Sequence, residues 1–102
     1  MDRDIVNLGA ILSLSGEASQ DARGIYDGIE LAIKILKEKG NNVVVHYIDD
    51  NSDIVTSVRA IDNLIRELDV KAIIGPTWAG HVDSFAPIRD QEKIITFATY
   101  CN

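Results

Sequence analysis

Several features that mark particular functional classes are scarce or missing in this 102-residue chain. The one cysteine, Cys101, cannot form an intrachain disulfide and has no neighbouring cysteine or histidine with which to hold a metal. Basic residues number ten against sixteen acidic ones, so a formal net charge of -6 offers no basic surface to a phosphate backbone or an anionic membrane. No run approaches the roughly 18 apolar residues of a membrane-spanning helix. We therefore expect no nucleic-acid partner and no membrane span.

A targeting segment is also missing from the sequence. Residues 1–4 lead directly into an apolar run, without a charged leader and a cleavage site before it. Either the protein is cytoplasmic or an export signal has been removed. The length and the hydrophobic content of 46% suit one ordinary globular unit, so we expect a single α/β domain over residues 1–102.

Short β-branched runs alternate with segments of helical periodicity along the chain. In 21–39 and 55–68 the apolar residues recur at spacings of three and four, as on one face of a helix. Other runs are short, apolar and ended by glycine or polar residues, which favours buried strands. The predicted order is strand 5–14, helix 21–39, strand 43–48, helix 55–68, strand 70–74, a short helix over 82–88, and strand 94–98.

This alternation predicts a fold class. Connections of helical length join parallel strands rather than hairpins, and the helices then cover both faces of the sheet. We expect a three-layer α/β fold with a parallel sheet of about four strands in the order 2-1-3-4, similar to half of a flavodoxin or Rossmann domain.

Ligands of such sheets lie beyond the carboxyl ends of the strands, which directs attention to the loops 13–20, 49–53, 75–81 and 98–102. The first loop lacks the three-glycine dinucleotide fingerprint, and no phosphate-binding loop motif occurs in the chain. Hydroxyls at Ser13, Ser15 and Ser19 are available to an anion, but we interpret them as helix caps. We therefore predict no nucleotide cofactor.

The acidic pair Asp49-Asp50 allows a magnesium-dependent phospho-acceptor site of the receiver-domain kind. In that class, however, the acidic pair follows the first strand rather than the second, and a metal needs several converging oxygens. Together with Asp53, the pair is better interpreted as a turn and helix cap, and no metal site is predicted.

The loop that we favour as a binding site is 75–80. Its small residues let a ligand approach the N–H groups at the start of a helix, and Trp78 can wall a pocket or serve as an ordinary core-edge aromatic. We interpret His46 and His81 as structural, because neither has a suitably spaced acid or cysteine. Since no Ser-His-Asp or Cys-His arrangement can be assembled, we predict no catalytic residue and no enzyme.

With these segments placed, the chain resembles the start of the type I periplasmic substrate-binding proteins, in the branch for branched-chain amino acids and amides. The matching segments are GAILSLSG at 9–16, GIELA at 28–32, DD at 49–50 with SD at 52–53, IIGP at 73–76, and IITFAT at 94–99. Members of that family are more than three times as long. They fold as two α/β lobes that close on a ligand and pass it to the membrane subunits of an ABC transporter.

The resemblance implies a periplasmic or extracellular module for a small amino-acid-like solute, with site residues in the loops after the third and fourth strands. It assigns the solute carboxylate to Trp78, Ala79 and Gly80, and the ammonium to Ala98, Thr99 and Tyr100. Backbone N–H groups at a helix start suit a carboxylate, and a strand-end carbonyl and hydroxyl suit an ammonium. The family often carries a hydroxyl where this chain has Ala79 or Gly80.

Other readings stay open at this stage. The chain matches only the N-terminal part of one lobe, so we expect weak binding alone. A ligand-sensing receptor ectodomain is an alternative parent. A second alternative is a fragment that self-associates without binding a solute. The uncharged run IITFATY at 94–100 gives the fourth strand an edge suited to homodimer formation. A third alternative function is that of a small flavodoxin-like enzyme or receiver domain.

Overall fold

A computed structural model describes residues 5–68, 70, 72–75, 77 and 94–97. Its elements follow the chain as β1 (Val6–Leu12), α1 (Ser19–Glu38), β2 (Val43–Asp49), α2 (Ile54–Leu68), β3 (Ala72–Ile74) and β4 (Ile95–Phe97). The strands form one parallel sheet in the order β2-β1-β3-β4. The α/β fold and the predicted strand order are confirmed. The predicted helix over 82–88 lies outside the described residues.

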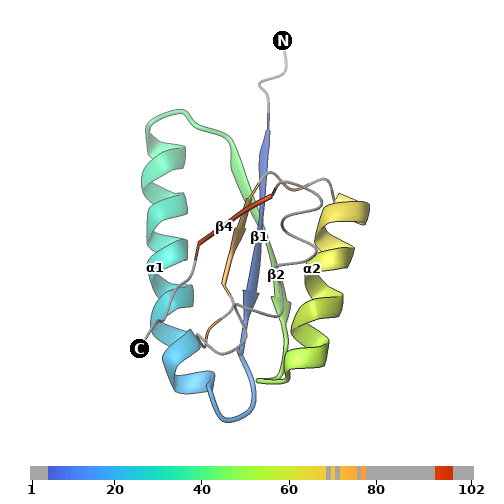
Figure 1. Cartoon of the computed structure of the whole chain (residues 1–102). Coiled ribbons are helices and arrows are strands. Elements are labelled where there is room, and N and C mark those ends of the chain that lie inside the picture. Colours follow the sequence, from blue (N-terminus) through green and yellow to red (C-terminus); the bar gives the residue numbers. More distant parts are fainter. Residues whose placement is uncertain (1–4, 69, 71, 76, 78–93, 98–102) are drawn as a thin grey trace.

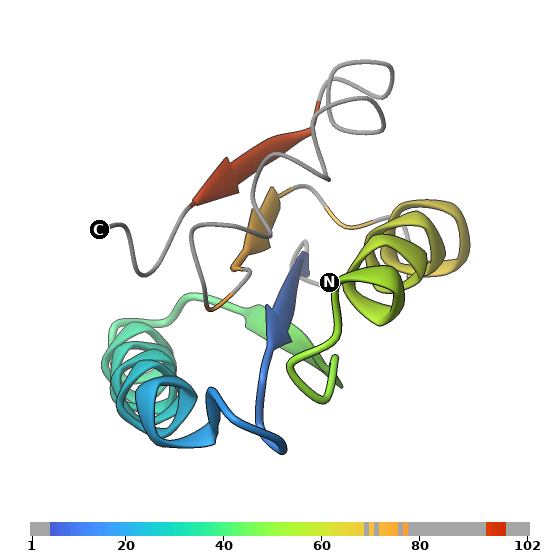
Figure 2. The ribbon, with the colours of Figure 1, turned by 60° about the horizontal axis from the view of Figure 1, so that its bottom comes forward.

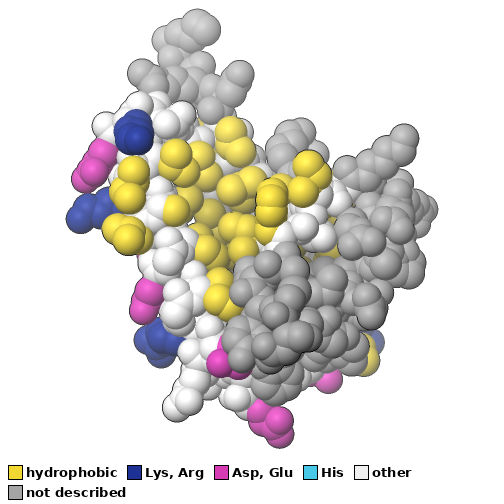
Figure 3. Space-filling model, turned by 60° about the vertical axis from the view of Figure 1, so that its left-hand side comes forward, with side chains coloured by type: hydrophobic (Ala, Val, Ile, Leu, Met, Phe, Trp, Pro, Cys, Tyr) yellow, Lys and Arg dark blue, Asp and Glu magenta, His cyan; other side chains and the backbone are white. Residues whose placement is uncertain are grey.

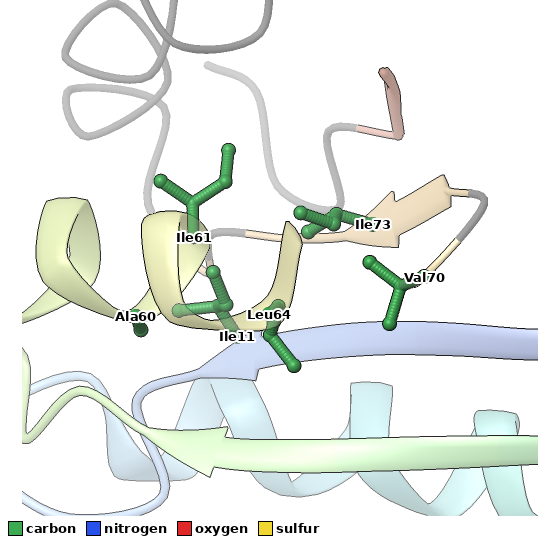
Figure 4. Close-up of a cluster of buried hydrophobic side chains, with 6 residues drawn as sticks. All are labelled: Ile11, Ala60, Ile61, Leu64, Val70 and Ile73. Atoms are coloured by element: carbon green, nitrogen blue, oxygen red, sulfur yellow. The ribbon is translucent and has the colours of Figure 1, made fainter. Parts of the chain in front are cut away.

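The sheet is covered on both faces, by α1 on one side and α2 on the other (Figures 1 and 2). β1 lies inside the sheet, and its side chains alternate between the two faces. Ala10 and Leu12 pack with Ala22 on the α1 side. Ile11 packs on the α2 side in the cluster drawn in Figure 4, whose members are Ile11, Ala60, Ile61, Leu64, Val70 and Ile73. Residues 9–12 of β1 are buried on both faces, which explains why this end of the strand carries no polar side chain.

The two ends of α1 are formed differently. At its C-terminus Gly40 has φ 87°, and the N–H groups of Lys39 and Asn41 donate to the carbonyls of Ile35 and Leu36. This left-handed glycine ends the helix where the sequence predicts. At the N-terminus the cap residue is Ala18, and no side chain caps the helix. The interpretation of the nearby serines as caps is therefore wrong.

β1 is shorter than predicted, ending at Leu12 rather than at residue 14. Beyond Leu12 the backbone N–H groups of Ser13 and Ser15 donate to side chains, Thr77 Oγ1 and Asp49 Oδ1, instead of to a neighbouring strand. The apolar pattern continues past the strand end because Leu14 packs against the cluster under α1.

Candidate functional site

The four parallel strands end at one edge of the sheet, so the loops that follow them start close together. The strand register pairs Leu12 with Asp49 and Ile74 with Phe97, the last residues of each strand. Neighbouring strands lie about 4.8 Å apart, so the last residues of β3 and β4 lie side by side. We call this the carboxyl edge.

A buried carboxylate joins three segments at the carboxyl edge. Asp50 is fully buried and accepts hydrogen bonds from the hydroxyl of Ser13 at 2.6 Å and the N–H of Ser52 at 2.9 Å. The hydroxyl of Ser57, inside α2, donates to its other oxygen. We name these four residues the Asp50 cluster. It ties the end of β1 to the β2–α2 loop and to α2 itself.

The loop after β3 is anchored to the same cluster through Thr77. Thr77 is fully buried, and its hydroxyl oxygen accepts the N–H of Ser13 at 2.8 Å. Ser13 therefore donates with its backbone to Thr77 and with its side chain to Asp50. Every buried side-chain polar atom among the described residues has a hydrogen-bond partner. In the described part of the carboxyl edge, the buried polar side chains therefore bond to other protein groups and have a structural role.

Gly75 holds the loop after β3 tightly between β1 and β4. Its N–H donates to the carbonyl of Phe97 at 2.9 Å, and its φ of 119° lies in a region that L side chains rarely adopt. A Cβ at this position would lie 2.1 Å from the carbonyl oxygen of Ile11. Only glycine therefore lets the chain cross so close to β1.

Asp49 lies on the outer side of the carboxyl edge and organises the loop after β1. Its carboxylate accepts the N–H and the hydroxyl of Ser15, at 3.1 and 2.7 Å, and the N–H of Asn51 at 2.9 Å. Partial burial favours the neutral form, but hydrogen bonds from Ser15, Asn51 and Leu14 outweigh it and lower the pKa of Asp49. Asp49 and Asp50 each accept the N–H two residues later, as in turns, so the turn interpretation is confirmed.

Asp53 confirms the predicted cap of the second helix. Its carboxylate accepts the N–H and the hydroxyl of Thr56, at 3.0 and 2.7 Å, immediately inside α2. In the part of the chain that the structure describes, no group of three or more acidic, histidine or cysteine side chains is placed to hold a metal. His46 bonds Asn7 Oδ1 through Nε2 at 3.0 Å, within the sheet.

The six residues predicted to hold a solute lie outside the described residues. They are Trp78, Ala79, Gly80, Ala98, Thr99 and Tyr100, and their roles stay predictions. What the structure describes is the residue before each segment, Thr77 and Phe97, and both are anchored at the carboxyl edge. The roles of Thr77 and Ser57 are not predicted from the sequence. The available signals are a hydroxyl shortly after a strand for Thr77 and a hydroxyl in the first turn of a helix for Ser57.

Comparison with known proteins decides the family. The sequence profile described as periplasmic binding protein matches residues 5–101. The chain belongs to this family. No curated protein sequence matches it. No described helix is both long enough and apolar enough to cross a membrane.

Solved structures of substrate-binding proteins share the fold. The leucine-binding protein LivK of Thermotoga maritima is 27% identical, with a TM-score of 0.84 over 95% of this chain and 28% of LivK. LivJ of Streptococcus pneumoniae, in complex with isoleucine, is 16% identical, with a TM-score of 0.90 over 97% of this chain and 30% of LivJ. A solute-binding protein of Rhodopseudomonas palustris, in complex with 3,4-dihydroxybenzoic acid, is 22% identical, with a TM-score of 0.89 over 98% of this chain and 28% of that protein. The chain thus spans less than a third of the length of these proteins.

Proposed function

We propose that the chain supplies one side of the binding site of a solute-binding protein, for a small amino-acid-like solute that carries a carboxylate. The family is a class of solute-binding proteins, which supports solute binding over chemical turnover. Isoleucine and 3,4-dihydroxybenzoic acid, the ligands named for two of the similar structures, are both small molecules with a carboxylate. An amino acid is our first choice, and an aromatic acid is the alternative solute.

The observation that carries this proposal is the anchoring of Thr77 and Phe97. Thr77 is bonded to the end of β1, and Phe97 receives the N–H of Gly75, so the two predicted ligand segments start from fixed neighbouring points. The N–H groups of residues 78–80 suit a carboxylate, and the carbonyls and hydroxyls of residues 98–100 suit an ammonium. Two such segments leaving adjacent strands can hold the two charged groups of one amino acid.

A larger assembly follows from this role. Solute-binding proteins of ABC importers act outside the cytoplasm and deliver solute to membrane subunits, so we place the parent protein in the periplasm or at the cell surface, with those subunits as partners. A ligand-sensing receptor ectodomain uses the same solute site and stays the alternative parent. In either case the 102-residue chain should bind weakly, because one face alone leaves the solute exposed to water.

Calorimetric titration tests the solute class. We expect leucine, isoleucine and valine to bind with Kd values of about 1 mM or weaker, as a half-exposed ligand should. Leucinamide, which keeps the ammonium but lacks the carboxylate, should bind more weakly than leucine. Gly80→Pro removes one predicted N–H donor and should abolish leucine binding, while Asp62→Ala, on α2, should not change it. Equal binding of leucine and leucinamide would refute the carboxylate site, and micromolar affinity would refute the half-site.

A further inference from the structure

β2 offers a row of backbone groups at one edge of the described sheet. Among the described strands it pairs with β1 alone. Val6 pairs with Val43 and donates its N–H to the carbonyl of Asn42, which fixes how the groups of β2 alternate along the ladder. The N–H and C=O groups of Val43, Val45 and Tyr47 therefore point away from β1. The strand contains neither proline nor lysine, the residues that commonly protect a sheet edge from pairing.

The side of α1 next to this edge carries charges in a regular order. Four exposed charged residues follow one another at spacings of three, four and three, which places them on one flank of the helix: Asp27, Glu30, Lys34 and Lys37. We call them the charged flank. The hydroxyl of Tyr47 in β2 donates to Glu30 at 2.5 Å, so the charged flank lies at the β2 end of the sheet (Figure 2). The apolar side chains exposed on α1 and β4 form a separate surface (Figure 3). Within the described part of the chain, none of the four charges forms an ion pair.

The middle of the charged flank lies level with Val45 of β2. The side chain of Tyr47 packs against the ring of Tyr26, with centroids 4.9 Å apart, and bonds to Glu30. Tyr47 is therefore level with the helical turn between these two residues. α1 and β2 run in opposite directions, and two strand residues span about 6.6 Å, the rise of roughly four helical residues. Val45, two residues before Tyr47, is thus level with about position 32 of α1, halfway along the charged flank.

A two-fold axis at Val45 would bring the opposite charges of two copies together. Asp27 and Lys37 lie equally far from the level of Val45, and so do Glu30 and Lys34. If two β2 strands pair antiparallel about Val45, each acidic residue of one charged flank faces a lysine of the other. Moving the axis by one strand residue in either direction would instead place Lys34 or Glu30 opposite its own copy. The order of charges therefore favours one partner, a second copy of this chain, in one register.

We propose that the chain forms a two-fold dimer in which the β2 strands pair antiparallel about Val45 and the α1 helices pack side by side. Val45 then pairs with its own copy and Val43 with Tyr47, so the outward N–H and C=O groups of all three residues gain partners. α1 lies over the β1–β2 end of the sheet, which puts the two copies of α1 about 10 Å apart, the spacing of packed helices. The dimer uses no residue of the carboxyl edge and does not depend on which solute is bound.

Sedimentation equilibrium of charge-reversal variants tests this arrangement. Lys37→Glu places an acid opposite Asp27 twice in the dimer and should weaken dimerisation by about tenfold or more, and Asp27→Lys should do the same. An equal mixture of these two variants should form a heterodimer as tight as the wild-type dimer, because opposite charges face each other again. The matched control, Arg59→Glu on α2, changes the net charge as Lys37→Glu does and should leave the dimer unchanged. All three positions are exposed, so the variants should fold like the wild type.

Amide hydrogen exchange locates the interface. The N–H groups of Val45 and Tyr47 should exchange more slowly as the wild-type chain dimerises, and this protection should be lost in Lys37→Glu. A wild-type monomer at every concentration, equal dimerisation of Lys37→Glu and Arg59→Glu, or a mixture no tighter than its two components would overturn the proposal. A dimer that Thr96→Lys abolishes would also overturn it, in favour of pairing at β4. No solute enters these measurements, so their failure leaves the carboxylate site standing, and failure of the titration leaves the dimer standing.

Discussion

Asp50 is a charged residue in a place where charges are rare, fully buried and bonded to Ser13, Ser52 and Ser57. Ser13, the most distant of these partners, precedes Asp50 by 37 residues in the sequence. The acidic pair was visible in the sequence as a turn, and that much was predictable from local chemistry. The burial of Asp50 was not predictable, because no local pattern shows which distant hydroxyl will donate to a carboxylate. For the same reason the sequence predicts caps at Ser13 and Ser15, although their hydroxyls donate to Asp50 and Asp49 across the edge.

Replacing Asp50 should show how much the Asp50 cluster contributes to the free energy of unfolding. Asp50→Ala leaves two buried hydroxyls and one partly buried N–H without their acceptor, and we expect a loss of about 3 kcal/mol in the free energy of unfolding. Asp50→Asn keeps one acceptor oxygen and should lose less. The control is Asp62→Ala, which breaks an exposed ion pair with Arg66 and should cost under about 0.5 kcal/mol. Urea denaturation measures all three, and equal losses for Asp50→Ala and Asp62→Ala would contradict the cluster.

Two glycines give a second comparison between single residues. Gly75→Ala puts a methyl group 2.1 Å from the Ile11 carbonyl oxygen at a φ of 119°, and we expect a loss of more than about 3 kcal/mol. Gly28→Ala meets open space in the middle of a helix and should stabilise the chain by about 0.5–1 kcal/mol. Thermal or urea unfolding followed by circular dichroism gives the signs. Stabilisation by Gly75→Ala would mean that the backbone at Gly75 is not held as described, and destabilisation by Gly28→Ala would mean that the space beside that glycine is not open.

The elements were more predictable than the contacts between them. Helical periodicity predicts α1 and α2, because burial of one helical face repeats the apolar residues at spacings of three and four. The strand order follows from the right-handed crossovers of alternating strands and helices. The ends were less accurate where side chains replace backbone partners. β1 ends at Leu12 because Thr77 and Asp49 accept its next N–H groups, a contact that no strand pattern encodes. The solute segments 78–80 and 98–100 were reached only through family resemblance, and their roles stay predictions.

The start of α2 offers a test at the level of one element. Asp53→Ala removes the acceptor of the Thr56 N–H and hydroxyl, and we expect a loss of about 1 kcal/mol in the free energy of unfolding. Asp53→Asn keeps an oxygen at the cap and should retain most of the stability. Urea denaturation with both variants checks the order. A loss as large for asparagine as for alanine would show that charge, rather than the cap bond, stabilises this end.

The sheet ends at β4, which leaves one edge of this strand unpaired among the described residues. β4 pairs with β3 on one side, and among the described strands none pairs with its other side. Since an unpaired strand edge attracts other chains, we expect the isolated chain to self-associate as its concentration rises. Light scattering should show this, and Thr96→Lys, a charge on the edge strand, should reduce it. Gly28→Leu, on α1, should have no effect. A monomer at every concentration would contradict the prediction.

The Asp50 cluster also discriminates between alignments of the two longest strands. Leu12 pairs with Asp49, so Ser13 and Asp50, the next residues, meet only in that register. Sliding β1 past β2 by one residue would carry the serine hydroxyl about 3.3 Å away and turn the strand's apolar side chains to the wrong faces. The misaligned sheet would then contain a buried carboxylate without its donor. Besides stabilising the folded sheet, the cluster therefore selects the correct strand register, because any other register leaves Asp50 without its donor.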